Sequence, residues 1–68
     1  MYKIIVTFYK TNGRMESRHE YSTAELNPNN IEEVKSNVKE KIGLLPELMT
    51  HTISITSGNK EFGYIVVK

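Results

Sequence analysis

The chain has 68 residues, a length that allows one domain with a single hydrophobic core. It contains no cysteine, which excludes disulfide bonds, thiolate nucleophiles and cysteine-based metal sites. The formal net charge is +1 and the pI is near 8.0, below the value of about 9 that is typical of strongly basic nucleic-acid-binding domains.

The first predicted element is a β-hairpin. Residues 2–9 are rich in β-branched and aromatic side chains, which favours a strand. Asn12-Gly13 follows, the dipeptide most typical of a two-residue type I′ turn. Counting outward from this turn gives the expected pairs Phe8–Ser17, Val6–His19, Ile4–Tyr21, Tyr9–Glu16, Thr7–Arg18 and Ile5–Glu20. This register makes one face of the hairpin mostly apolar and the other charged.

A single helix is predicted next, over residues 31–42. Its apolar residues recur at steps of three and four and form one stripe: Ile31, Val34, Val38 and Ile42. Asn30 and Glu33 resemble a capping box at its start, and Gly43 is the expected left-handed terminator.

A second hairpin closes the chain. Residues 50–56 alternate between polar and apolar side chains, as a half-buried strand does. A tight turn is expected with Gly58 and Asn59 at its centre. Counting from it gives the pairs Ile55–Phe62, Ile53–Tyr64, His51–Val66, Thr56–Glu61, Ser54–Gly63, Thr52–Ile65 and Thr50–Val67.

Together these elements predict an α+β domain of the ββαββ type, with a four-stranded mixed sheet and one helix on one face. The first and last strands are apolar on both faces, whereas the second and third have polar outer faces. Interior strands tolerate apolar residues on both faces, and edge strands tend to be polar or charged. We therefore expect the strand order 2-1-4-3, with the first and last strands parallel at the centre.

This order resembles the β-grasp architecture, in particular the immunoglobulin-binding domains of protein G. The resemblance covers the whole chain as a pattern of elements and implies a single domain, residues 1–68. It implies no activity, because one fold hosts many functions. A ferredoxin-like arrangement is disfavoured because it needs a second helix.

No arrangement of side chains indicates catalysis, so we expect a protein that is not an enzyme. The serines lack a nucleophile-elbow context, and the four glycines are too widely separated for a phosphate-binding loop. In the expected sheet order His19 and His51 lie on opposite edges, three strand spacings of about 4.8 Å apart, too far to share a metal ion. We expect neither a metal site nor a cofactor.

Residues 1–8 are apolar but too few for a membrane span of about 20 residues, and they lack the features of a signal peptide. A soluble cytoplasmic protein with no membrane partner is therefore expected.

Protein binding is the leading functional hypothesis. On the expected sheet, the outer face of the two central strands carries an uncovered apolar patch made of Ile5, Tyr9, Ile65 and Val67. The third strand forms an edge without charge or proline, where Thr52 and Ser54 are candidates for strand pairing. The expected partner is a larger protein, for which this module is an adaptor or inhibitor, or a second copy of the chain in a homodimer.

Nucleic-acid binding is the alternative. The expected topology places five basic residues at one end of the domain: Lys10, Arg14, Lys39, Lys41 and Lys68. The tyrosines are scattered and form no stacking platform, and the modest net charge gives little support.

Overall fold

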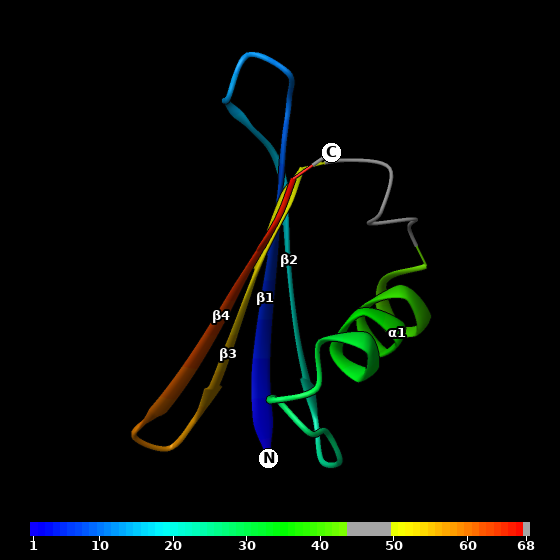
Figure 1. The fold of residues 1–68 in the computed structure, drawn as a ribbon, viewed down its shortest axis with the longest axis vertical. Helices are drawn as coiled ribbons and strands as arrows, with labels where there is room; N and C mark the ends of the chain where they lie inside the picture. Colours follow the sequence, from blue (N-terminus) through cyan, green and yellow to red (C-terminus); the bar gives the residue numbers. More distant parts are fainter. Residues whose placement is uncertain (44–49, 68) are drawn as a thin grey trace.

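The computed structural model describes residues 1–43 and 50–67. Its elements are β1 (Tyr2–Tyr9), β2 (Met15–Thr23), α1 (Ile31–Ile42), β3 (His51–Ser57) and β4 (Lys60–Val66). The strands form one antiparallel sheet in the order β2-β1-β3-β4, and α1 lies on one side of it (Figure 1). The predicted α+β class and ββαββ succession are confirmed.

The predicted strand order 2-1-4-3 is wrong, and with it the β-grasp arrangement and the mixed sheet. β3, not β4, lies beside β1 and runs antiparallel to it, with Ile4 opposite Ile55 and Val6 opposite Ile53. The prediction took apolar residues on the outer face as the sign of a central strand. On β4 this criterion fails, because the outward Ile65 is 75% exposed.

The core-facing side chains explain why β3 is central. Ile53 and Ile55 of β3 are at most 1% exposed, whereas Phe62 and Tyr64 of β4 are only partly buried. The buried side chains of the two central strands are Ile4, Val6 and Phe8 on β1 and His51, Ile53 and Ile55 on β3. Larger aromatic side chains reach inward from the edge.

The first hairpin keeps the predicted register over most of its length but differs at its tip. Phe8 lies opposite Ser17, as predicted, but Tyr9 lies opposite Met15, so Glu16 is an extra residue in a bulge. The Lys10 N–H donates to the Arg14 carbonyl at 2.8 Å, which leaves a three-residue loop in place of the predicted two-residue turn. The longer loop shifts the strand pairing by one residue at Tyr9–Met15, and the extra residue in β2 restores the predicted pairing at Phe8–Ser17.

In the second hairpin the predicted pairs from His51–Val66 to Thr56–Glu61 are confirmed, and Ser57 faces Lys60 across the turn. Gly58 has a φ of 60°, which is the left-handed value that the first central position of a type II′ turn requires. The predicted pair Thr50–Val67 lies beyond the observed ladder, which ends at His51 and Val66.

The helix begins and ends where the sequence predicts. The Asn30 side chain accepts hydrogen bonds from the Glu32 and Glu33 amides at 3.1 and 3.2 Å. Glu33 in turn accepts from the Asn27 amide at 3.1 Å, so the return bond of the box reaches further back along the chain. Gly43 has a φ of 76°, and its N–H donates to the Lys39 carbonyl at 3.0 Å.

One compact core joins the sheet to the helix. Its buried members are Ile4, Val6, Phe8, Val34, Val38, Ile53 and Ile55. Burying each of these side chains contributes about 1.5–3 kcal/mol before the cost of chain entropy.

Two tyrosines also attach the sheet to the helical layer. The Tyr21 hydroxyl of β2 donates to Asn37 Oδ1 at 2.6 Å, and the Tyr64 hydroxyl of β4 donates to the Pro28 carbonyl. Burial raises the pKa of Tyr21 to about 12. The helical layer is therefore bonded to both edge strands.

Candidate functional site

The predicted apolar patch on the outer sheet face is not contiguous. Ile5 on β1 lies opposite Ser54 of β3, which in turn lies opposite Gly63 of β4. Ile65 is separated from Thr7 of β1 in the same way by Thr52. Because β3 lies between β1 and β4, a row of Thr and Ser divides the predicted patch.

The members of that patch differ in environment. Ile5 and Tyr9 on β1 are half-buried by their neighbours on the sheet, whereas Ile65 is 75% exposed and Val67, which follows β4, is 73% exposed. The strongly exposed apolar side chains of this set thus belong to one edge of the sheet.

The predicted strand-pairing site at Thr52 and Ser54 is also wrong as an edge. Both residues lie on β3, which pairs with β1 on one side and with β4 on the other. Their backbone groups lie in an interior strand and cannot accept a further strand. The edges of the sheet are β2 and β4.

The β2 edge is protected by charge. The Lys3 ammonium lies 2.9 Å from a Glu20 carboxylate oxygen, and Arg18 lies 3.6 Å from the other oxygen. The hydrogen bond and the charge of Lys3 hold the pKa of Glu20 below its ordinary value. Charged side chains along an edge oppose pairing with a foreign strand.

The other edge lacks this protection. We call residues 61–67 the β4 edge. After Glu61 it contains neither a charged residue nor a proline, and it ends in Ile65, Val66 and Val67. An edge of this kind is a template for pairing with another strand.

The turn geometry indicates which residues of the β4 edge face outward. Residues that flank a two-residue turn form a hydrogen-bonded pair, and such pairs alternate along an antiparallel ladder. Ser57 and Lys60 flank the turn, so every second residue from Lys60 onward bonds to β3. The N–H and C=O groups of Glu61, Gly63 and Ile65 therefore point away from the sheet.

Gly63 leaves a gap in the middle of this edge. A Cβ atom built at this position would meet nothing within 4 Å. The sequence predicts Gly63 as the partner of Ser54. A glycine inside a strand can also mark the close approach of another backbone, and the sequence itself carries this signal.

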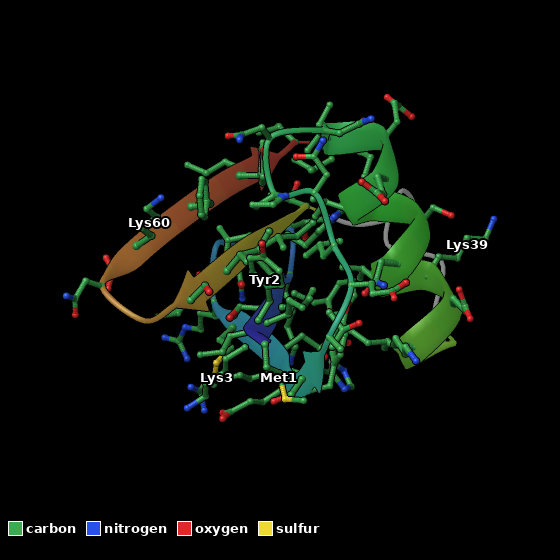
Figure 2. The ribbon with its side chains drawn as sticks, turned by 90° about the horizontal axis from the view of Figure 1, so that it is seen from below. Met1, Tyr2, Lys3, Lys39 and Lys60 are labelled. Carbon is green, nitrogen blue, oxygen red and sulfur yellow. The ribbon has the colours of Figure 1, made fainter. Side chains whose placement is uncertain are left out.

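The predicted basic end is divided between two separate elements. Lys10 and Arg14 belong to the tip of the first hairpin, which extends beyond the last β1–β3 pair at Phe8 and His51 (Figure 1). Lys39 and Lys41 lie in the last turn of α1, and Lys39 points away from the sheet (Figure 2). Lys68 lies outside the described residues.

An open groove of about 710 Å³ lies at the opposite end of the domain. It is formed where the start of β1, the segment before α1 and the β3–β4 turn meet, and Figure 2 looks at this end with Tyr2 near the middle. Its walls are aromatic and amide groups with one cation, chiefly Tyr2, Phe62, Asn27, Asn59 and Lys60. The Asn27 side chain is engaged with the Asn29 amide at 3.1 Å.

The prediction that the two histidines lie on opposite edges of the sheet is wrong, because β3 is an interior strand. His19 on β2 and His51 on β3 flank Phe8, with ring centroids 5.6 and 5.5 Å from the phenyl ring. His51 is fully buried, and His19 Nε2 is buried without a hydrogen-bond partner in the structure. Over the described residues, no group of three or more His, Asp or Glu side chains is placed to hold a metal ion.

Comparison of the chain with protein-family models, curated proteins and solved structures found no match. Within residues 1–43 and 50–67, no helix is long and apolar enough to cross a membrane.

Proposed function

We propose that this chain is a small non-catalytic protein-interaction module, and that it binds an extended segment of a partner at the β4 edge. In this mode the segment adds a strand to the sheet. Main-chain hydrogen bonds then supply affinity, and alternate side chains supply specificity. The observation that carries the proposal is the contrast between the two edges, because β2 is charged and β4 is uncharged after Glu61.

This proposal replaces the interior β3 residues with β4 as the strand that accepts the partner. It retains Ile65 and Val67, whose side chains are the most exposed apolar groups of the predicted set. A bound strand would cover part of both. It would also satisfy the outward N–H and C=O groups of Glu61, Gly63 and Ile65.

A peptide-display selection tests the proposal, with random peptides taking the place of the partner segment. A random peptide library is selected for binding to the protein, and the affinity of each enriched peptide is then measured for wild type and for two variants. Ile65→Lys places a charge on the β4 edge. Met15→Lys makes the same kind of change on β2, where Met15 is 59% exposed. We expect binding to fall roughly tenfold or more for Ile65→Lys and to stay unchanged for Met15→Lys.

Amide hydrogen exchange then locates the bound peptide. We expect the amides of Gly63 and Ile65 to become protected, because they point outward in the free protein. Peptides that bind both variants equally, or that protect β2 amides, would contradict the proposal. Retention on immobilised nucleic acid that weakens steeply with salt and is lost for Lys10→Glu would favour the alternative function.

A further inference from the structure

We propose that the strand bound at the β4 edge is β4 of a second copy of this chain. The two strands would run antiparallel about a two-fold axis, with Gly63 of each copy opposite Ile65 of the other. The inference rests on the proposed function, because it requires that the β4 edge accepts a strand.

The symmetry of such a contact restricts the register. In a two-fold interface, if residue i faces residue j then j also faces i. Residues directly opposite each other in an antiparallel pair share one face of the sheet. Outward-bonding residues must also face outward-bonding residues to exchange both hydrogen bonds. Only registers that pair Glu61, Gly63, Ile65 and Val67 among themselves meet all these conditions.

Among these registers, the one that places Gly63 opposite Ile65 pairs the longest stretch of the edge. It sets Glu61 opposite Val67 and Tyr64 on the two-fold axis. The registers shifted by one position place Gly63 opposite Gly63 or Ile65 opposite Ile65, and in both the paired stretch is shorter. The structure thus offers one most extensive self-pairing.

Shape and charge favour the same register. The space above Gly63 is open, and Ile65 is 75% exposed, so the isoleucine of each copy covers the glycine gap of the other. Large side chains packed over an edge glycine from the neighbouring strand also restore contacts that the glycine lacks. Between residues 62 and 67 no charge from either copy is brought against another.

The assembly would be an eight-stranded antiparallel sheet with a helix from each copy on the same side, since the two-fold axis is perpendicular to the sheet. Both Tyr64 hydroxyl bonds to the Pro28 carbonyl lie on that helical side and remain in place. A contact through one strand edge is small, of the class below about 1,200 Å² that associates reversibly. We therefore expect a dimer that dissociates on dilution.

Sedimentation equilibrium tests the association. Over a range of about a hundredfold in concentration, we expect the full chain to pass from monomer to dimer. Ile65→Lys should weaken the dimer roughly tenfold or more, and the matched Met15→Lys variant should leave it unchanged. Far-UV circular dichroism verifies that both variants fold. A wild-type chain that stays monomeric throughout, or an Ile65→Lys chain that dimerises like wild type, would overturn the inference.

Engineered cysteines test the register, because the native chain has none. An equimolar mixture of Gly63→Cys and Ile65→Cys chains should form the mixed disulfide in preference to either symmetric one. The Cα atoms of a hydrogen-bonded antiparallel pair lie about 5.5 Å apart, a separation that a disulfide spans. Predominant linkage of residue 63 to residue 63, or of 65 to 65, would refute the proposed register.

The peptide selection separates this inference from the proposed function. A monomeric chain whose Gly63 and Ile65 amides are protected by selected peptides would overturn self-association and leave strand addition at the β4 edge intact. A dimer that leaves those amides unprotected, in a chain that also selects no edge-binding peptide, would overturn both.

Discussion

The position of β3 beside β1 can be tested by an engineered disulfide within one chain. Thr7 and Thr52 lie directly opposite each other on the outer sheet face. The Cα atoms of such a pair are about 4.5–5.5 Å apart, within the range of roughly 4.4–6.8 Å that disulfides span. We therefore expect the Thr7→Cys/Thr52→Cys variant to form an intramolecular bond when it is oxidised at low concentration.

The stabilisation can be estimated from the length of the closed loop. A bond between positions 7 and 52 encloses about 45 residues, for which the chain-entropy relation gives about 4 kcal/mol. Strain in engineered bridges commonly reduces this gain, so we expect the free energy of unfolding to rise by about 2–4 kcal/mol. Urea unfolding of the oxidised variant, compared with the same variant in reductant, measures the difference.

A second pair serves as the control. Thr7 and Ile65 lie in the same row of the sheet, but Thr52 of β3 separates them. Two strand spacings amount to about 9.6 Å, which exceeds the reach of a disulfide. The Thr7→Cys/Ile65→Cys variant should stay reduced and gain no stability. A bond in this pair, with none between positions 7 and 52, would refute the observed strand order.

Three further changes address the core, the helix cap and a buried hydroxyl. Ile55→Val should lower the free energy of unfolding by about 0.5–1.5 kcal/mol, because Ile55 is fully buried. The control Ile65→Val, at the exposed edge, should change it by less than about 0.5 kcal/mol. Thermal unfolding of both variants measures the difference. Asn30→Ala should cost about 1 kcal/mol, because it removes the acceptor for two amides at the start of α1. Asn29→Ala, one position earlier, is its control in urea unfolding, and equal losses would contradict the assigned cap. The pKa of Tyr21 is raised to about 12, above the value near 10 of an unfolded chain, so the stability that its neutral phenol contributes is complete below pH 10 and is lost as the pH rises toward 12. Urea titrations across this interval should show a shallower decline for Tyr21→Phe than for wild type, and parallel curves would refute the assignment.

Local signals were sufficient to predict the separate elements. The Asn30 cap, the Gly43 terminator and the apolar stripe between them each act within a few residues, and all are observed. The second hairpin was predictable for the same reason, because Gly58 fixes the turn and the turn fixes the register. The predicted two-residue turn of the first hairpin is wrong, since Asn-Gly also suits a three-residue loop whose last residue is glycine.

The strand order depends on a relation between elements that residue-by-residue patterns do not express. Both orders keep β2 and β3 parallel and connected through α1, so the crossover does not distinguish them. Both also bury the same faces of the hairpins. Apolarity of the outer face therefore does not distinguish an edge strand from an interior strand in this sheet, and the predicted strand-pairing site at Thr52 and Ser54 lies on β3, which is interior.

The chirality of the backbone links the strand order to the bulge in the first hairpin. In a strand of L-residues, the face of a side chain and the strand direction together determine the edge toward which the same residue's N–H and C=O point. With a two-residue turn, the core-facing Ile53 and Ile55 must direct these groups toward β4. In the first hairpin, the Lys10–Arg14 bond and the bulge direct the same groups of the core-facing β1 residues toward β2. Because β1 and β3 run antiparallel, the two requirements together place β4 outside β3 and exclude 2-1-4-3, whereas the predicted two-residue turn at Asn12-Gly13 is compatible with that order.

The bulge at Glu16 has a consequence for how the first hairpin tolerates change. A three-residue loop with one extra residue in β2 produces the same core register as a two-residue turn with none, since Phe8 faces Ser17 in either case. The hydrogen bonds differ, because the Lys10–Arg14 bond makes the core-facing residues of β1 bond to β2, whereas a two-residue turn between Thr11 and Arg14 would make the outward-facing residues do so. Deletion of Glu16, which removes the bulge and leaves the three-residue loop, should therefore preserve both the register and the hydrogen bonds of the layers beneath, whereas a change that imposes a two-residue turn should not.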